Sequence, residues 1–184
     1  AIDDIERVNA GGVANLIELC KARGSMLVQI STGSVAGDRV NGYPDKDRIF
    51  DEQSFYIGQM IDNQYVRSKF LAERYVLEAV KDGMRAKIMR VGNLAPRSKD
   101  GEFQINFATN GFMGRLRAFK LIGAYPYPMM SYPVEFAPID ETAEAILRLC
   151  TTSDKCVIFH PFNNHYIPLG DIILRMKEAG LDNS

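Results

Sequence analysis

Residues 26–37 read MLVQISTGSVAG, a short apolar run rich in β-branched residues that ends in hydroxyls and glycines. This pattern predicts a buried parallel strand at Leu27–Ser31 that opens into a loop. A second apolar run, Lys87–Val91, breaks at Gly92, and a helical segment lies between the two runs. The order strand, loop, helix, strand predicts a βαβ crossover, and open α/β sheets bind ligands at the carboxyl ends of such strands.

The helix between these strands carries Tyr65 and Lys69 four residues apart, so both side chains project from one face. A neighbouring ammonium favours the phenolate, and we therefore expect Lys69 to lower the pKa of Tyr65. The phenol would then exchange a proton near neutral pH, as general acid–base catalysis requires. The spacing alone is weak evidence, because a solvated helix face produces such pairs by chance. The flanking strands give the pair its significance.

Several segments, in a fixed order, resemble the extended short-chain dehydrogenase/reductases. They are residues 9–19 (NAGGVANLIEL), residues 31–35 (STGSV), the Tyr65-x-x-x-Lys69 pair and residues 90–94 (RVGNL). Residues 100–107 (DGEFQINF) and 138–143 (PIDETA) narrow the resemblance to the terminal thioester reductase domains of nonribosomal peptide synthetases. The resemblance runs over nearly the whole chain, and its specificity lies in the order of the segments.

The resemblance implies an α/β fold: an NAD(P)-binding Rossmann-like fold, truncated at the amino end, with a small and mostly helical substrate region. We expect residues 1–96 to form the carboxyl-terminal half of the dinucleotide-binding core, and residues 97–184 to form the substrate region with the closing strand and helices. No G-x-G-x-x-G turn lies between Ala1 and the first predicted strand. Because such a turn binds the pyrophosphate, this chain by itself is expected to bind the cofactor weakly.

The resemblance also implies three catalytic residues. Tyr65 would donate the proton, and Lys69 would hydrogen-bond the nicotinamide ribose. Thr32 would share its hydroxyl with the substrate carbonyl oxygen and stabilise the developing oxyanion. Alternatively, Thr32 only caps the strand-to-loop turn, and Ser34 is the second candidate for the catalytic hydroxyl. Asn9 would support the hydrogen-bond network of the site, unless it is a plain surface amide of its helix.

The cofactor implied by the resemblance is NADPH. The residues expected to bind it are Ser31, Tyr65, Lys69, Gly92, Asn93 and Leu94. The backbone at Gly92 can approach a flat ring closely because glycine has no side chain, although a plain strand-ending turn is the alternative. No metal site is expected, since His160 and His165 have no acidic or cysteine partners nearby.

The implied reaction is the NADPH-dependent reductive release of a peptidyl or aminoacyl thioester from the phosphopantetheine of a carrier protein domain. The product would be an aldehyde, or an alcohol after a second hydride transfer. Five basic residues would attract the phosphate of the phosphopantetheine arm and an acidic carrier protein; alternatively, they are ordinary surface charge. They are Arg97, Lys99, Arg115, Arg117 and Lys120. Two alternatives stay open: an NAD-dependent nucleotide-sugar epimerase or dehydratase, and a catalytically silent binding or assembly module.

The composition excludes several kinds of partner. The 184 residues are 46% hydrophobic with a formal net charge of −1, which gives no basis for nucleic-acid binding. No apolar run approaches the roughly 18 residues of a membrane span, and no signal peptide is evident, so a cytoplasmic location is expected. Three cysteines without metal or redox spacing predict reduced thiols. Strand Leu27–Ser31 would have an open apolar edge, which predicts self-association.

Periodicity and capping residues predict the regular elements. The expected helices are Asp3–Arg23, Asp62–Asp82, Phe103–Ala118, Glu141–Thr152 and Leu169–Ala179, and the expected strands are Leu27–Ser31, Lys87–Val91 and Val157–Phe159. Gly24 and Gly83 stand where helix C-caps belong, and Asp140 stands where an N-cap belongs. Residues 38–58 and 123–136 are predicted to be long irregular loops.

Overall fold

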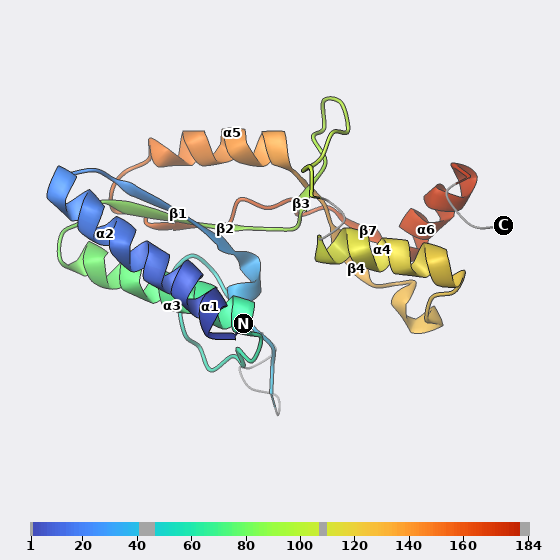
Figure 1. Ribbon diagram of the computed structural model, residues 1–184, viewed down its shortest axis with the longest axis horizontal. Coiled ribbons are helices and arrows are strands. Elements are labelled where there is room, and N and C mark those ends of the chain that lie inside the picture. Colours follow the sequence, from blue (N-terminus) through green and yellow to red (C-terminus); the bar gives the residue numbers. More distant parts are fainter. Residues whose placement is uncertain (1, 41–46, 107–109, 181–184) are drawn as a thin grey trace. The chain divides into compact units, whose positions relative to one another are not determined.

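The computed structural model describes residues 2–40, 47–106 and 110–180. The chain divides into two compact units (Figure 1). The first unit comprises Ala1–Gly92 and Thr142–Phe162, and the second comprises Asn93–Glu141 and Asn163–Ser184. The boundary predicted after residue 96 lies close to Gly92, where the chain first passes from the first unit into the second. The sequence assigns residues 142–162 to the second part, but they belong to the first unit because strand β6 (Ile158–Phe159) joins its sheet.

A three-stranded parallel sheet forms the centre of the first unit. Its strands are β1 (Leu27–Thr32), β2 (Ala86–Val91) and β6, in the order β1-β2-β6. The register pairs Leu27 with Ala86 and continues to the end of both strands. Helix α3 (Gln64–Lys81) connects β1 to β2 and packs against both strands. The predicted βαβ crossover is therefore confirmed.

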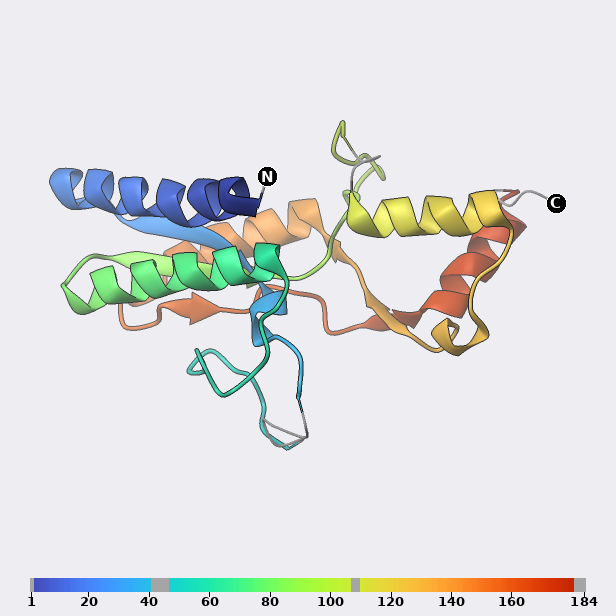
Figure 2. The same ribbon diagram turned by 60° about the horizontal axis from the view of Figure 1, so that its bottom comes forward.

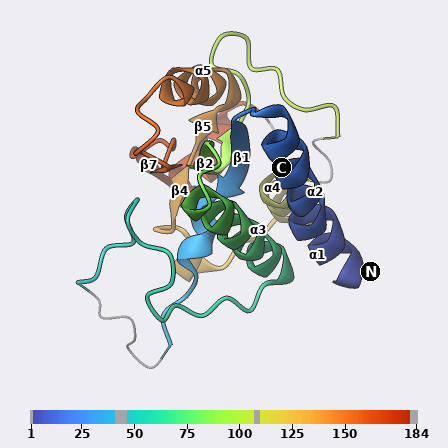
Figure 3. The same ribbon diagram turned by 90° about the vertical axis from the view of Figure 1, so that its left-hand side faces the viewer.

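Helices cover both faces of this sheet (Figure 1, Figure 3). One face is covered by α3 and by the helical segment before β1, which consists of α1 (Ile2–Glu6), the π-helix η1 (Arg7–Gly11) and α2 (Gly12–Arg23). Helix α5 (Ile139–Cys150) lies on the opposite face. The expected helix Asp3–Arg23 is present, with one π-helical turn that the sequence did not predict.

The core of the first unit is formed by the inner faces of α2, α3 and the two longer strands. Its buried hydrophobic members are Val13, Ile17, Leu27, Ala72, Val76, Ala79, Met84, Ala86 and Ile88. Removing these side chains from water supplies the main driving force for this packing. Gly24 ends α2 as predicted, with a φ of 63°, a left-handed conformation that glycine adopts without steric cost.

The two longer strands differ in their exposure to solvent. All six residues of β2 are buried, and these include Lys87 and Arg90, each 0% exposed. Strand β1 lies at the edge of the sheet within the described residues, and its Ile30 is 41% exposed. The open edge that the sequence predicts for this strand is therefore present.

The connection from β1 to α3 begins with the 3-10 helix η2 (Gly33–Ala36). Gly37 follows with a φ of 63°, and a Cβ atom there would lie 2.4 Å from the carbonyl oxygen of Met60. Only glycine fits this position, because any other side chain would clash with that backbone. Asp38 forms an isolated antiparallel bridge with Met60, which ties the far end of the connection back to the end of β1.

The second unit consists of helices and short strands. Its elements are β3 (Leu94–Ala95), α4 (Gly111–Ile122), η4 (Tyr127–Met129), β4 (Pro133–Glu135), β5 (Ala137–Pro138), β7 (Tyr166–Pro168) and α6 (Leu169–Glu178). Strands β3 and β5 pair in parallel, and β4 and β7 pair antiparallel. Leu116, Val134, Leu169 and Ile173 form its buried centre. Strands of two or three residues leave no periodic pattern, which is why the sequence did not predict them.

Two sequence predictions in the second unit are wrong. The helix expected from Phe103 begins at Gly111, because the side chain of Asn110 accepts hydrogen bonds from the first backbone N–H groups of α4. Residues 107–109 of that expected helix, like residues 41–46 of the expected first loop, lie outside the described residues. Asp140 is no N-cap, since α5 begins one residue earlier, and its carboxylate accepts from the backbone and hydroxyl of Ser98.

Within the described ranges, none of the helices combines the length and the apolarity that a membrane crossing requires. Cys20, Cys150 and Cys156 are free. The same ranges contain no group of three histidine, cysteine or acidic residues placed to hold a metal ion.

Candidate functional site

Helix α3 places Tyr65 and Lys69 together at its amino-terminal end. The side chain of Asn63 caps the helix by accepting hydrogen bonds from the backbone of Tyr65 (2.9 Å) and Val66 (3.3 Å). The ammonium of Lys69 lies 5.9 Å from the centre of the Tyr65 ring and donates a 3.1 Å hydrogen bond to the carbonyl of Ile30. Tyr65 is 46% exposed. The predicted pair therefore exists, and it is anchored to strand β1.

The expected lowering of the Tyr65 pKa is wrong. Partial burial raises the pKa of the Tyr65 phenol above its usual value, and it lowers the pKa of the Lys69 ammonium. The ammonium faces the Ile30 carbonyl and the phenol ring, so burial outweighs its attraction for a phenolate. Tyr65 consequently holds its proton at neutral pH, and it is suited to donate that proton.

Thr32 is the last residue of β1 and the N-cap of η2, and its Oγ1 accepts a 3.2 Å hydrogen bond from the backbone N–H of Ser34. Helix α3 packs against both β1 and η2. Figure 2 shows η2 and the amino-terminal end of α3 at the same end of the first unit. The fold therefore brings the end of strand β1 and the Tyr65 helix together. Ser34, the second candidate hydroxyl, is exposed at the same turn.

Ser31 points into the protein interior, because successive side chains of a strand alternate between the two faces. Ser31 is 2% exposed, and its hydroxyl donates a 2.5 Å hydrogen bond to the carboxylate of Glu73. The side chain is thus engaged inside the protein. A contact between Ser31 and a cofactor would have to use its backbone.

Sequence reasoning missed a buried ion pair beneath the candidate site. Glu73 and Arg90 are both 0% exposed, and Arg90 Nη2 lies 2.8 Å from Glu73 Oε2. Two residues of the sequence could have indicated this pair. Glu73 follows Tyr65 by eight residues in the same helix, and Arg90 lies inside the apolar run that forms β2. A buried charge requires a partner, so each of these residues predicts the other.

Arg90 also holds the loop before α3. Its guanidinium donates to the carbonyls of Asp51 (3.3 Å) and Ser54 (3.0 Å), and it lies 4.6 Å from the centre of the Phe50 ring. His160 Nε2 lies 3.3 Å from Arg90 Nη1. Burial, reinforced by the charge of Arg90, lowers the pKa of His160. A neutral His160 can accept the hydrogen bond from Arg90, which gives this histidine a structural role.

The backbone after β2 contains the other residues expected at the cofactor. Gly92 ends the first unit directly after β2. In the second unit, the N–H of Asn93 donates a 2.9 Å hydrogen bond to Glu135 Oε2, and Leu94 belongs to β3. Glu135 Oε1 accepts a further bond from the N–H of Asn163 (3.0 Å). Glu135 therefore fixes the start of the segment that the sequence assigns to the nicotinamide.

Asn9 lies in the π-helical turn η1, a feature that often marks functional sites. Its side-chain amide donates a 2.9 Å hydrogen bond to the hydroxyl of Ser68, and that hydroxyl donates to the backbone carbonyl of Tyr65 (2.7 Å). The amide thus has a defined partner beneath the Tyr65 turn, in line with the supporting role considered for it.

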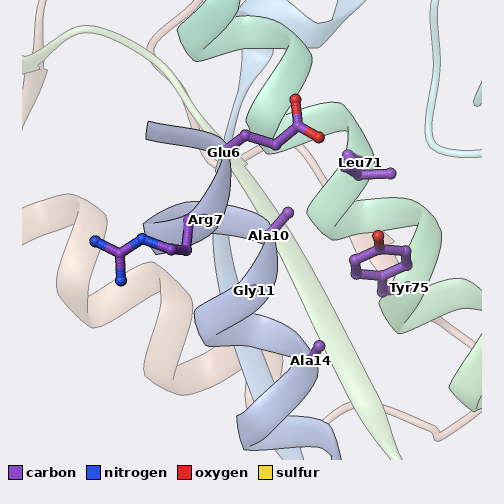
Figure 4. Close-up of a pocket in the computed structure, with 7 residues that line it drawn as sticks. All are labelled: Glu6, Arg7, Ala10, Gly11, Ala14, Leu71 and Tyr75. Atoms are coloured by element: carbon purple, nitrogen blue, oxygen red, sulfur yellow. The ribbon is translucent and has the colours of Figure 1, made fainter. Parts of the chain in front are cut away.

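A separate groove of about 520 Å³ lies between the α1–α2 segment and α3 (Figure 4). It is lined by Glu6, Arg7, Ala10, Gly11, Ala14, Leu71 and Tyr75. The small residues leave this space between the helices, and in Figure 4 the guanidinium of Arg7 points away from α3. The groove contains none of the residues expected to act on substrate or cofactor.

A parallel sheet with a Tyr–Lys helix beside the end of its edge strand defines a Rossmann-like fold of the NAD(P)-binding reductase and epimerase class. Residues 1–146 match the model of the NAD-binding family described as Male sterility protein, and the chain belongs to this family.

The most informative comparisons are with reductase domains. The chain is 42% identical to a thiolation-reductase di-domain from an archaeal non-ribosomal peptide synthetase, with a TM-score of 0.89 over 97% of this chain and 38% of that chain. It is 30% identical to the reductase domain of the aureusimine biosynthetic cluster, with a TM-score of 0.82 over 94% of this chain and 46% of that chain.

A curated relative agrees with these structures. The non-canonical nonribosomal peptide synthetase cpsA of Aspergillus campestris (strain IBT 28561) is 29% identical over 161 residues, which cover 84% of this chain. The chain spans 15% of the length of that relative, and less than half of each of the two solved chains. The resemblance to terminal reductase domains is therefore confirmed.

Proposed function

We propose that this chain forms the catalytic part of an NADPH-dependent thioester reductase, which releases a carrier-bound acyl or peptidyl chain as an aldehyde. The observation that carries the proposal is the Tyr65–Lys69 pair, anchored to strand β1 next to the Thr32 turn. The 42% identity to a thiolation-reductase di-domain supports a thioester substrate over a nucleotide sugar.

In the proposed reaction, NADPH supplies hydride for the thioester carbon. Tyr65 keeps its proton at neutral pH and donates it to the carbonyl oxygen as negative charge develops there. Thr32 accepts a hydrogen bond from Ser34, which leaves its own hydroxyl hydrogen to stabilise the same oxygen. The resulting hemithioacetal then breaks its carbon–sulfur bond, so that the phosphopantetheine thiol leaves and the aldehyde remains.

The nicotinamide half of NADPH fits the residues of this site. The Lys69 ammonium has three N–H donors, and one of them bonds to the Ile30 carbonyl. The other two are suited to ribose hydroxyls. Gly92 presents backbone without a side chain at the end of β2, and the adjoining Asn93–Leu94 backbone is the further proposed contact. Ser31 would contact the cofactor through its backbone alone, because its hydroxyl is bonded to Glu73.

A carrier domain would dock near the exposed arginines of α4. One member of the expected basic set is already engaged, since the guanidinium of Arg97 pairs with Asp100 and Glu102. Arg115 and Arg117 are exposed on α4 and have no ion pair among the described residues. Charge of this kind raises the association rate with an acidic partner and weakens with salt. We expect Arg115→Glu/Arg117→Glu to raise KM for a carrier-bound thioester and to leave KM for a thioester of free pantetheine unchanged.

The function is tested by incubating the full-length protein with an acyl thioester on a phosphopantetheinyl carrier and with NADPH. We expect loss of NADPH absorbance and a trapped aldehyde. Turnover of a nucleotide sugar without net NADPH consumption would favour the epimerase alternative. Absence of cofactor binding in a calorimetric titration would favour the silent binding module. Replacing NADPH with NADH in the same assay decides the cofactor preference.

The open edge of β1 supports one further proposal about assembly. Its backbone pairs with β2 on one side alone among the described residues, and Ile30 is exposed beside it. Such edges tend to pair with another strand. We expect the 184-residue chain to self-associate in light scattering, with rapid amide exchange in β1 of any monomer. A monodisperse monomer with a protected β1 would contradict this proposal.

A further inference from the structure

A buried polar network has one member on each of three elements: β1 and α3, which carry the proposed catalytic groups, and β2, which leads to the proposed cofactor contact at Gly92. In β1, Ser31 directly precedes Thr32. In α3, Glu73 lies one turn beyond Lys69 and two turns beyond Tyr65, on the same face of the helix. In β2, Arg90 lies two residues before Gly92. The network therefore lies on the same three elements as the candidate site.

The three members are joined by direct bonds. Ser31 and Arg90 are register partners on neighbouring parallel strands. Glu73 lies over both of them: Oε1 accepts from the Ser31 hydroxyl at 2.5 Å and from Arg90 Nε at 3.1 Å, while Oε2 accepts from Arg90 Nη2 at 2.8 Å. One carboxylate thus fixes α3 against β1 and β2 simultaneously.

Each nitrogen of the Arg90 guanidinium has a hydrogen-bond partner in this network. The five N–H donors of the Arg90 guanidinium face the Glu73 carboxylate, two loop carbonyls and a ring nitrogen. Burying two charges is costly, and a buried ion pair is often no more stable than apolar side chains of the same size. Its directional hydrogen bonds nevertheless join three separate elements at defined distances.

We propose that Ser31, Glu73 and Arg90 are positioning residues, which set the distance between the Thr32 turn at the end of β1 and the Tyr65–Lys69 end of α3. This inference rests on the proposed reductase function. A shift of about 1 Å between reacting groups costs roughly a hundredfold in rate, so a rigid connection between the Thr32 turn and the Tyr65 helix has a direct catalytic consequence.

Lys87 provides a matched control on the same strand. It is also 0% exposed, and its ammonium donates to the carbonyls of Thr152, Ser153 and Cys156 at 3.3, 2.7 and 2.7 Å. These partners belong to the turn after α5, and among the described residues the Lys87 ammonium makes no hydrogen bond to Ser31, Glu73 or Arg90. Lys87→Met therefore removes a buried cation without disturbing the network.

The test compares Ser31→Ala, the double variant Glu73→Leu/Arg90→Met, and Lys87→Met in the full-length protein. The double variant exchanges the ion pair for apolar side chains, so that it retains packing. The measurement is the single-turnover rate of NADPH oxidation per folded molecule, at saturating NADPH and thioester, over a range of pH. We expect a loss of tenfold or more for Ser31→Ala and the double variant, with at most a twofold change for Lys87→Met. Folded variants with the wild-type rate and pH profile would overturn the proposal.

A second readout separates this inference from the proposed function. The amide NMR signals of Thr32 and Tyr65 report the local geometry whether or not the protein reduces a thioester. We expect Ser31→Ala to shift the signal of Tyr65, which is remote from position 31 in the sequence, and Lys87→Met to leave it in place; the Thr32 signal shifts in any variant of its neighbour Ser31. An inactive wild type would refute the reductase function alone, whereas an unmoved Tyr65 signal in Ser31→Ala would refute the positioning role.

Discussion

Two regions of helix α3 lie on the same face and differ in almost every physical respect. At the amino-terminal end, Tyr65 is 46% exposed, and Lys69 makes one hydrogen bond within the described part of the chain, to the backbone carbonyl of Ile30. Two turns further on, Glu73 is fully buried and bonded to both Ser31 and Arg90. The comparison teaches that one helix face can combine an exposed end, where a ligand is proposed to bind, with a buried end whose hydrogen bonds join α3 to β1 and β2.

The two ends of α3 should differ most in how much their side chains contribute to the free energy of unfolding. Glu73→Ala leaves the Arg90 guanidinium buried without its carboxylate, and we expect the free energy of unfolding to fall by about 3–5 kcal/mol. Lys69→Ala should have a much smaller effect, since the site is half-buried and open to water. Urea unfolding of both variants measures the difference. Equal urea midpoints of the two variants would show that the buried Glu73–Arg90 pair stabilises the fold no more than Lys69 does.

A smaller effect is expected from removing the Thr32 hydroxyl. Thr32→Val keeps the shape of the side chain but loses one donor to the developing oxyanion, and we expect the rate of thioester reduction to fall at least about tenfold. Thr32→Ser should retain most of the rate. Ser34→Ala serves as the control, and if it lowers the rate more than Thr32→Val, then Ser34 supplies the catalytic hydroxyl.

The smallest effect expected is a pH-dependent change in stability from Asp140 in the second unit. Hydrogen bonds from the backbone and hydroxyl of Ser98 hold the pKa of Asp140 at about 2, below its usual 3.8. A lowered folded-state pKa contributes stability above pH 3.8, and this contribution is lost as the pH falls toward 2. We expect Asp140→Asn to lose slightly in thermal midpoint at pH 7 and to match the wild type near pH 2. A constant difference between these pH values would show that the carboxylate charge is not involved.

Sequence reasoning identified the region of the molecule that has strong local patterns. The apolar run at Leu27–Ser31 correctly predicted the βαβ unit, and the four-residue spacing correctly placed Tyr65 and Lys69 side by side on α3, because strand and helix periodicity are local properties. The sequence could not show that Ser31 points inward to Glu73, since the phase of a strand relative to its neighbours depends on tertiary packing. It also gave the wrong direction for the Tyr65 pKa, because burial cannot be read from a four-residue spacing.

The second unit was harder to predict for a related reason. Strands β3, β4, β5 and β7 have two or three residues each, so they show no periodicity. They are held by long-range pairing and by side chains such as Glu135, which accepts hydrogen bonds from Asn93 and Asn163. Interactions between residues far apart in sequence leave no trace in a local pattern.

The most direct test of the central claim, that the exposed end of α3 donates the proton during reduction, is Tyr65→Phe in the full-length protein. The substitution removes one hydroxyl and keeps the ring, so the fold and the NADPH dissociation constant should remain nearly unchanged. We expect the rate of hydride transfer, measured by stopped-flow at saturating NADPH and carrier-bound thioester, to fall by about 10²–10⁴. A Tyr65→Phe variant that reduces the thioester at close to the wild-type rate would contradict the account.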